Sequence, residues 1–370
     1  MLYIHIPYCH HKCTYCGFYS VAGHRDTEAY VDALCRELAM RKSDSPLKTI
    51  YFGGGTPTLL PLHQLQKIVE IIRRCYDVSE VEEVTIEANP ENLTPDYLRG
   101  LQGMGFFNRL SIGVQSFNDG ELRLLNRVHN SRQAVDAIVD ASNFGFDNIS
   151  VDLIMGLPGQ DADGWKKNLD MLSNVLDMNT VKHLSCYELT VEKGSILERQ
   201  IQMGRVALAD DETLADQYDT LLEWCRDNGF EQYEVSNFCK PGYRSRHNSR
   251  YWNRTPYIGV GAAAHSFDGN RRRWNMSDVD GYIAGASKGE VPHEEEMLTA
   301  ADAYNEYVMT ALRTVDGIDK SLVAPEYVEH LSRSVQRFVD EGLVAETMTH
   351  YRPTLKGLLQ ADGIAASLFV

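Results

Sequence analysis

Short apolar runs alternate with longer amphipathic segments through the first half of the chain, and this alternation constrains the fold more than any other feature. Strands that alternate with helices run parallel and are joined by right-handed crossovers, so we predict an α/β fold with a barrel-like or doubly wound sheet. The apolar runs predict strands at residues 2–7, 48–55, 83–90, 108–115, 148–156 and 180–189. Apolar residues recur every three or four positions, as in helices, at residues 27–41, 62–76, 131–145 and 164–178.

The pattern changes after about residue 190, and an acidic, proline-containing segment at residues 287–297 indicates a domain boundary. We predict a first domain of residues 1–290 and a second domain of residues 291–370, the second with helices and a short hairpin of winged-helix type. Residues 290–370 contain 14 Asp or Glu but only 6 Lys or Arg. A capping or docking domain fits this charge better than a DNA-binding domain.

The whole chain is also acidic, with a net charge of -16 and a pI near 5.2. General attraction to nucleic acid is therefore unfavourable, because phosphate binding needs clustered Lys and Arg. The one dense basic run, Arg271 to Arg273, is short and predicts a solvated turn. No segment approaches the roughly 20 apolar residues that span a bilayer, and no signal peptide precedes the first predicted strand, so we expect a cytoplasmic protein.

Polar and glycine-rich segments directly follow several predicted strands. In parallel α/β folds the carboxyl ends of the strands meet at one edge, where binding sites form, so we expect these segments to lie together. They read CHHKCTYC, GGGTPT, EANP, VQSF and MGLPGQ.

Three cysteines, Cys9, Cys13 and Cys16, lie in the first of these segments, and two kinds of metal centre compete for them. Zinc could take the three thiolates together with His10 or His11. Structural zinc sites, however, usually join two ligand-bearing segments, whereas these thiols share one loop. A cubane iron-sulfur cluster accepts such a loop, and three ligands leave one iron free to bind a small molecule.

The spacing Cys-x3-Cys-x2-Cys at the end of a first strand resembles the signature of the radical S-adenosylmethionine (SAM) superfamily. The resemblance implies a 4Fe-4S cluster on Cys9, Cys13 and Cys16, whose open iron binds the amino and carboxylate groups of SAM. It also implies a partial (β/α)6 barrel. The turn at residues 53–57 is similar to the superfamily's glycine motif, whose backbone approaches SAM closely.

Several further motifs resemble one family within that superfamily, which contains oxygen-independent coproporphyrinogen III oxidase and the related heme chaperone HemW. These motifs are YIHIPYC, TIEANP, LSIGVQSF, LNRVH and VDLIMGLPGQ. Each polar residue in them could instead be an ordinary satisfied group at a barrel rim. The resemblance implies SAM contacts by Tyr3, Tyr15, Gly54, Gly55, Thr56, Glu87, Gln115, Arg127, Asp152 and, in the loop GVGAAAH, His265.

Two features favour the chaperone branch of this family over the oxidase branch. Phe18 stands where the oxidase has a further cysteine, two positions after the third cluster ligand. Residues 247–252, HNSRYW, match the motif His-Asn-x-x-Tyr-Trp that is associated with heme binding, and a neutral imidazole is an ordinary ligand of heme iron. The resemblance implies heme contacts by His247, Asn248, Tyr251 and Trp252.

The resemblance therefore predicts a heme chaperone that binds heme, a 4Fe-4S cluster and SAM, and that transfers heme to an acceptor hemoprotein without a required turnover of SAM. The alternatives are an oxygen-independent coproporphyrinogen III oxidase, another heme-modifying radical SAM enzyme and a structural zinc protein. An electron donor is expected if SAM is cleaved. Peripheral membrane association and a homodimer stay open, and no nucleic acid partner is expected.

Overall fold

The fold is built around one curved sheet in which six central strands run parallel, as the sequence predicts. The structure is a computed structural model that describes residues 1–23, 27–43, 45–175 and 180–370. The sheet has nine strands in the order β11-β1-β4-β5-β6-β7-β8-β10-β9. The six central strands are β1 (Leu2–Ile6), β4 (Thr49–Gly54), β5 (Glu83–Ala88), β6 (Arg109–Gln115), β7 (Ile149–Met155) and β8 (Val181–Glu188).

Three short strands from late in the chain extend this sheet at both edges. β11 (Ile258–Val260) pairs in parallel with β1, while β10 (Asn237–Cys239) pairs antiparallel with β8 and then with β9 (Glu231–Gln232). They are only two or three residues long, too short to show a period of apolar residues in the sequence.

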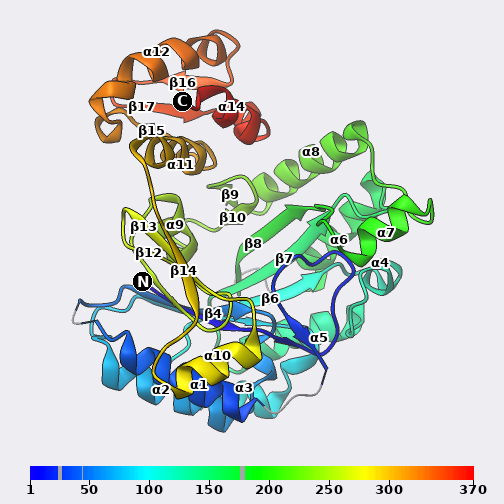
Figure 1. The fold of residues 1–370 in the computed structure, drawn as a ribbon. Helices are drawn as coiled ribbons and strands as arrows, with labels where there is room; N and C mark the ends of the chain where they lie inside the picture. Colours follow the sequence, from blue (N-terminus) through cyan, green and yellow to red (C-terminus); the bar gives the residue numbers. More distant parts are fainter. Residues whose placement is uncertain (24–26, 44, 176–179) are drawn as a thin grey trace.

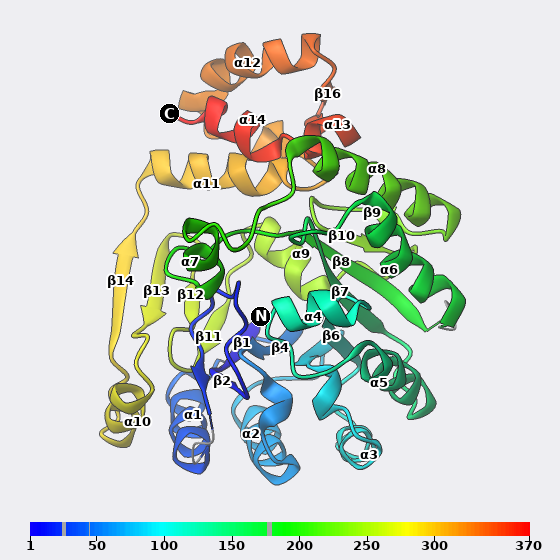
Figure 2. The ribbon, with the colours of Figure 1, turned by 90° about the vertical axis from the view of Figure 1, so that its right-hand side faces the viewer.

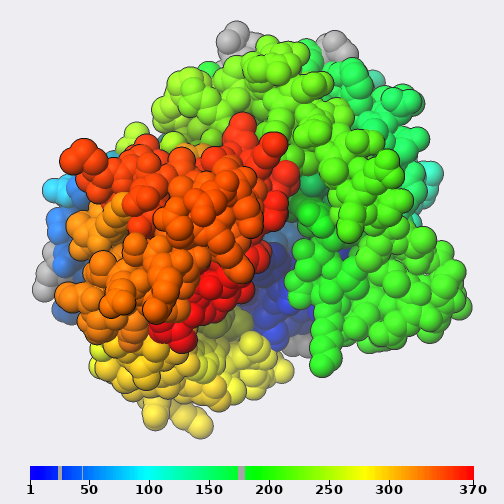
Figure 3. All heavy atoms as spheres, turned by 90° about the horizontal axis from the view of Figure 1, so that it is seen from above, coloured from blue at the N-terminus to red at the C-terminus, as the bar shows by residue number. Residues whose placement is uncertain are grey.

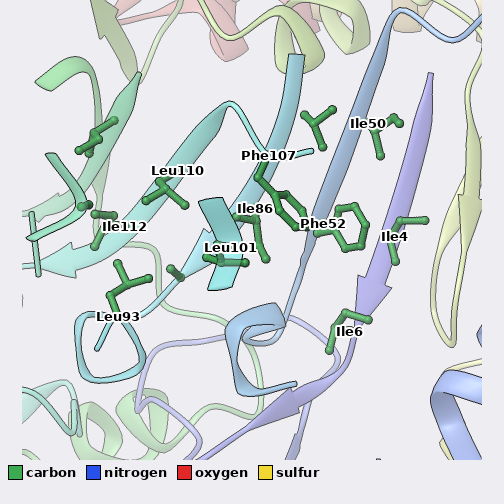
Figure 4. Close-up of a cluster of buried hydrophobic side chains, with 14 of the residues drawn as sticks. Ile4, Ile6, Ile50, Phe52, Ile86, Leu93, Leu101, Phe107, Leu110 and Ile112 are labelled. Carbon is green, nitrogen blue, oxygen red and sulfur yellow. The ribbon is translucent and has the colours of Figure 1, made fainter. Parts of the chain in front are cut away.

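Helices cover the outer face of the sheet as an arc (Figures 1 and 2). Strand residues such as Ile4, Phe52 and Ile86 point toward these helices and are fully buried (Figure 4). The predicted helix at residues 164–178 corresponds to α6, and its last three positions lie outside the described residues. The helices of the arc are α1 (Glu28–Met40), α2 (Leu62–Cys75), α3 (Pro95–Gly103), α5 (Ser131–Asn143), α6 (Ala162–Val175) and α8 (Asp211–Asp227).

The inner face of the sheet is polar, because side chains alternate between the two faces of a strand. On β1, Tyr3 and His5 alternate with apolar residues that face the helices, so their own side chains face the inside of the curve. Tyr51 on β4, Glu87 on β5 and Asp152 on β7 face the inside in the same way. This alternation places a row of titratable groups inside the curve of the sheet. Tyr3, Glu87 and Asp152, three of the predicted SAM contacts, belong to this row.

A second, three-stranded sheet stands beside the amino-terminal end of β1 (Figure 1). It contains β12 (His265–Phe267), β13 (Arg271–Asn275) and β14 (His293–Met297), and the prediction of a solvated turn for Arg271 to Arg273 is wrong. These arginines are three of the five residues of the central strand, in which Arg271 lies 3.3 Å from Glu295 of β14 and Arg272 lies 2.8 Å from Glu306.

Shorter elements connect these parts of the fold. The loop after β1 contains β2 (Tyr8–Cys9) and β3 (Val21–Ala22), and the motif HNSRYW lies in helix α9. The remaining helices of this region are η1 (Pro57–Leu59), η2 (Pro90–Asn92), α4 (Asp119–Leu124), α7 (Ile196–Gln202), α9 (Arg246–Trp252) and α10 (Val279–Ser287).

The carboxyl-terminal region has a hydrophobic core of its own, which includes Val308, Leu331, Val335 and Ile364. It contains helices and a short hairpin, as expected, while the winged-helix type and the division between residues 290 and 291 stay predictions. Among the described residues, no helix is both long enough and apolar enough to cross a membrane. The elements are α11 (Ala300–Leu312), β15 (Ile318–Asp319), η3 (Lys320–Leu322), α12 (Pro325–Asp340), β16 (Val344–Glu346), β17 (His350–Pro353), α13 (Leu355–Leu358) and α14 (Ala361–Leu368).

Candidate functional site

The three predicted cluster ligands lie in one partly exposed loop at the carboxyl edge of the sheet, as free thiols. Thr14, which lies between Cys13 and Cys16, holds this loop in place. Its backbone N–H and its hydroxyl donate to the carbonyl oxygens of Leu125 and Leu124 at 3.2 and 3.1 Å. The cysteines therefore come from a loop anchored to the barrel rather than from a free segment.

A chain of polar contacts connects two of these thiols through the neighbouring strand ends. The Thr56 hydroxyl donates to Cys9 Sγ at 3.7 Å, and Asn89 Nδ2 donates to Thr56 Oγ1 at 3.1 Å. Arg127 donates from Nη2 to Asn89 Oδ1 at 2.6 Å and from Nη1 to Cys13 Sγ at 3.5 Å. Residues from four separate segments, two of them predicted contacts of SAM, are thus joined around the cysteine loop.

The glycine-rich turn packs directly against the backbone of this loop. Gly55 and Thr56 donate backbone hydrogen bonds to the carbonyl oxygens of Ile6 and Tyr8 at 2.8 and 2.7 Å. Gly54 has a φ of 110°, and a Cβ there would lie 2.5 Å from the His5 ring. A side chain at this position would be strained by the backbone and blocked by the imidazole, so glycine is required.

Glu87 faces the inside of the barrel beside this turn. Tyr51 Oη donates to Glu87 Oε1 at 2.8 Å, and the Gly54 backbone N–H donates to Oε2 at 3.1 Å. The Tyr3 ring stacks on the Tyr51 ring with centroids 6.1 Å apart. Burial raises the pKa of Glu87 to about 7, although the hydrogen bond from Tyr51 opposes the rise. This carboxyl group can therefore change charge near neutral pH when no ligand is present.

Asp152 occupies the corresponding position on β7. The Ser111 hydroxyl lies 3.2 Å from both of its carboxylate oxygens, and the Ser150 hydroxyl lies 3.3 Å from one. Burial raises the pKa of Asp152, and the hydroxyl of Ser185 on β8 counteracts that rise. Gln115 ends β6 with a φ of 67°, a left-handed conformation that is uncommon for a residue other than glycine. Such conformations are concentrated at binding sites.

The remaining residues predicted to contact SAM are less closely connected. Tyr15, within the cysteine loop, packs against the small apolar cluster that includes Leu125 and Leu157, and burial raises its pKa. His265 is exposed on β12, where its ring stacks on Trp274 with centroids 6.0 Å apart. Phe18 is 69% exposed, so no packing requirement accounts for an aromatic side chain there.

The donor set at the loop fits an iron-sulfur cluster. Burial raises the pKa of Cys9 and Cys16, and the neighbouring thiols add to the rise, so a bound metal would favour their thiolate forms. The guanidinium of Arg127 lies beside Cys13 Sγ and offsets negative charge there. Among the described residues, no group of three His, Cys, Asp or Glu side chains is arranged to hold a single metal ion.

Viewed from above, the molecule is hollowed between the carboxyl-terminal region and the green segment that contains α7 and α8, with blue amino-terminal residues at the floor of the hollow (Figure 3). In Figure 2 the cysteine loop, drawn in blue, stands in front of the strand ends. The inner face of the barrel is thus approached past both the cysteine loop and the carboxyl-terminal region.

The predicted heme ligand, His247, does not face solvent. It lies in the first turn of α9 and is 0% exposed, with its Nδ1 2.9 Å from Thr49 Oγ1 and its Nε2 3.0 Å from Tyr251 Oη. Burial lowers the pKa of His247 to about 3, so the ring is neutral. Two backbone N–H groups at the start of α9 donate to the Glu83 carboxylate, each at 2.9 Å.

The other residues of this motif lie along the same helix. Asn248, Tyr251 and Trp252 are partly exposed. Tyr251 and Trp252 line a small cavity of about 170 Å³ between α9 and α11, and the Arg313 guanidinium lies over the Trp252 ring at 5.5 Å. The motif thus sits at the amino-terminal ends of the strands, on the side of the barrel opposite the cysteine loop.

Residues 3–172 match the family model of the radical SAM superfamily, and residues 298–359 match the model of the HemN C-terminal domain. The chain is also 37% identical to the heme chaperone HemW of Bacillus subtilis over 98% of its own length and 97% of that protein. The chain belongs to the HemW family. The HemW of Lactococcus lactis is 33% identical, with 85% of this chain and 82% of that protein covered, and the HemW of Mycobacterium tuberculosis is 32% identical, with 99% and 94% covered.

The coproporphyrinogen III oxidase HemN of Escherichia coli has a similar structure. Its TM-score is 0.85 over 100% of this chain and 89% of that chain, at 24% sequence identity. This likeness concerns the fold, and it confirms the predicted partial barrel with a small carboxyl-terminal domain. The prediction of the HemW family from Phe18 and residues 247–252 is confirmed by the relatives.

The structure adds two residues to the site that the sequence reasoning gave no role. Tyr51 orients Glu87, and Asn89 connects Thr56 with Arg127. Asn89 stands inside the quoted segment EANP, and Tyr51 precedes Gly53 by two positions on the same face of β4. The period of two along a strand is therefore the signal that could have found Tyr51.

Proposed function

We propose that this chain is a heme chaperone of the cytoplasm, which binds heme and transfers it to an acceptor hemoprotein. The observation that carries the proposal is the similarity to heme chaperones over nearly the whole of both chains. The position of α9 supports it, because the motif HNSRYW lies beside cavities at the amino-terminal ends of the strands. The cluster loop lies at the opposite edge of the sheet, so heme and the cluster would not compete for one place.

We further propose that Cys9, Cys13 and Cys16 hold a 4Fe-4S cluster and that SAM binds between it and the inner face of the barrel. When present, such a cluster supplies the electrons for reductive cleavage of SAM. The contacts of Glu87 and Arg127 support two roles: a carboxylate to receive the SAM ammonium and a guanidinium to pair with a carboxylate. The other proposed SAM contacts are Tyr3, Tyr15, Gly54, Gly55, Thr56, Gln115, Asp152 and His265.

For heme, we propose His247 as the iron ligand and Asn248, Tyr251 and Trp252 as its neighbours. A neutral imidazole binds iron through an unprotonated nitrogen, and Nε2 of His247 faces the Tyr251 hydroxyl at 3.0 Å. Heme ligation therefore requires this hydroxyl to move away. We infer that the Tyr251 hydroxyl keeps Nε2 of His247 occupied until heme binds.

The test is a heme titration of the cluster-loaded full-length protein, followed by absorbance. His247→Ala should lose heme binding, whereas Tyr251→Phe, which releases Nε2, should retain it. His183→Ala is the matched control, because His183 is also fully buried on the inner face, with Ser150 and Tyr233 on its two nitrogens at 2.8 Å each. Unchanged heme binding by His247→Ala would contradict the assignment of the ligand.

Transfer is tested separately by mixing heme-loaded protein with an apo-hemoprotein and measuring the rate at which the acceptor gains heme. We expect transfer without consumption of SAM. Formation of deoxyadenosine coupled to loss of heme, or conversion of coproporphyrinogen III in the presence of SAM and reductant, would instead favour an enzyme.

A further inference from the structure

Strand β6, which carries Gln115, ends in an irregular way. Gly113 pairs with Asp152 of β7, and Gln115 pairs with the very next residue of β7, so one residue of β6 is extra at this point. An extra residue bends the end of a strand and changes the direction of the side chain that follows it. The φ of 67° at Gln115 is unfavourable for glutamine and persists only where the surrounding structure holds it. Other groups must therefore fix this turn.

The side-chain amide of Gln115 lies among the polar groups that we assign to SAM. A Cβ on Gly113 would lie 2.8 Å from Gln115 Nε2, 3.2 Å from Asn89 Oδ1 and 3.4 Å from Arg127 Nη2. Three polar side chains thus surround the space that the glycine leaves open. No residue that the structure describes forms a hydrogen bond with the Gln115 amide, so the amide is available to a ligand.

The turn that follows Gln115 is fixed by two buried polar side chains from other elements. The hydroxyl of Ser116 lies 2.6 Å from Glu121 Oε2 of α4 and 3.0 Å from Asn168 Oδ1 of α6. The backbone N–H of Phe117 donates to the same Asn168 oxygen at 2.5 Å. The two residues directly after Gln115 are therefore both attached to neighbouring helices, and this attachment holds the left-handed conformation.

Glu121 is the centre of this arrangement. Its Oε2 accepts hydrogen bonds from Gln160 Nε2 at 2.9 Å and from Asn168 Nδ2 at 3.2 Å, in addition to the one from Ser116. One carboxylate oxygen thus joins α4, the turn after β6, the loop after β7 and α6. All four side chains are buried, and a buried donor that loses its acceptor is costly, so the arrangement is rigid.

Helix α4 does not depend on Glu121 for its own place in the fold. Leu122 is 1% exposed and Leu125 is 0% exposed, and Leu125 belongs to an apolar cluster with Ile154 and Leu157. Loss of the Glu121 carboxylate should therefore leave α4, and the cysteine loop that is attached to its end, in position. The part that loses its support is the turn that carries Gln115.

We propose that Glu121 is a positioning residue for SAM binding, which holds Ser116 and thereby fixes the conformation in which Gln115 presents its amide to the ligand. The inference rests on the proposed SAM site. Glu121 acts through the turn rather than by touching SAM, because its Oε2 is occupied by three donors of the protein itself.

The experiment is a double-mutant cycle on SAM affinity, measured by equilibrium dialysis with the cluster-loaded full-length protein. Gln115→Ala and Glu121→Ala should each weaken SAM binding about tenfold, or by about 1.4 kcal/mol. Glu121→Ala should have little further effect when residue 115 is already alanine, because both changes remove the same contact. Glu121→Gln should retain part of the affinity, because its amide oxygen can still accept from Ser116.

Glu234→Ala is the matched control. Glu234 is also a buried carboxylate, 1% exposed, which accepts from the Ser236 N–H at 3.1 Å and from the Asn237 amide, but it lies at the other edge of the sheet, between β9 and β10. Its replacement should lower stability in urea unfolding as Glu121→Ala does, with SAM affinity unchanged. Ser116→Ala, which removes only a hydroxyl, should reproduce the loss of SAM affinity and serves as the test if Glu121→Ala does not fold.

Three results would overturn the proposal. The first is additive effects of Gln115→Ala and Glu121→Ala on SAM binding, and the second is unchanged SAM affinity in Ser116→Ala and Glu121→Ala. The third is a loss of iron and sulfide from Glu121→Ala, because the carboxylate would then act on the cysteine loop. The proposed SAM site fails in a different way: if Gln115→Ala binds SAM as tightly as the unaltered protein, Gln115 is not a contact of SAM, whatever Glu121 does.

Discussion

Replacement of Glu87 by Gln tests the electrostatics of the inner face most directly. Burial raises the pKa of this carboxyl group from 4.5 to about 7, and the folded protein therefore holds a proton there that the unfolded chain has already released. Because the unfolded chain binds fewer protons in this range, the free energy of unfolding falls as the pH rises from 4.5 to 7. Glutamine cannot ionise, so the variant should not show this loss.

The expected size follows from the shift. A pKa change from 4.5 to about 7 corresponds to at most about 3 kcal/mol above pH 7, of which about 2 kcal/mol is lost between pH 5.5 and 8. The side chain keeps some contact with solvent, which makes these figures upper values. Glutamine also has one acceptor oxygen rather than two, so the Gly54 N–H loses its partner at a cost of about 1 kcal/mol at every pH.

The assay is urea unfolding of the unaltered protein and Glu87→Gln at pH 5.5 and pH 8, without SAM. The variant should be relatively more stable at pH 8 than at pH 5.5 by up to about 2 kcal/mol. SAM binding by the cluster-loaded protein should strengthen as the pH rises through 7, and this dependence should vanish in the variant. A stability difference that is the same at both pH values would show that Glu87 titrates normally and would refute the reasoning.

The other predictions concern a cluster ligand, Arg127 and the first turn of α5. Cys13→Ala should lower the iron and sulfide content and the visible absorbance of anaerobically reconstituted protein, whereas Cys35→Ala, a buried thiol in α1, should not. Arg127→Lys removes the guanidinium that holds Asn89. The variant should bind SAM about tenfold or more weakly in calorimetry, because hydrogen bonds to charged groups contribute about 1.5–3 kcal/mol. Asn130→Ala removes the capping box of α5 and should cost about 1 kcal/mol in urea unfolding, with heme binding unchanged.

The parallel sheet and the position of the site could be predicted because both follow from local patterns. The strand from Thr49 to Gly54 is an apolar run that ends in glycines, and the next strand ends in Glu87 and Asn89. Parallel strands bring such ends to one edge whatever their order in the sheet. The sequence therefore predicts which residues meet at the edge, although not which atoms touch.

The surroundings of His247 could not be predicted in this way. Its ring contacts Thr49 and Tyr51, about 200 positions earlier in the chain, and that proximity depends on how α9 enters the barrel. The run from Arg271 to Arg273 misled for a related reason. Consecutive charges indicate a solvated turn when read alone, but here they lie in the middle strand of a sheet, where Arg271 pairs with Glu295 and Arg272 pairs with Glu306.

The pairing of β11 with β1 bears on how the chain is made. β1 finds one neighbour in β4 soon after it emerges, but Ile258 is synthesised about 250 residues after Ile6. At roughly 5–20 residues per second, that interval is on the order of 10–50 s. During this time β1 has an open edge, the kind of surface at which chains aggregate. β1 therefore completes its place in the sheet only when the second half of the chain has been made, although its other neighbour is available early.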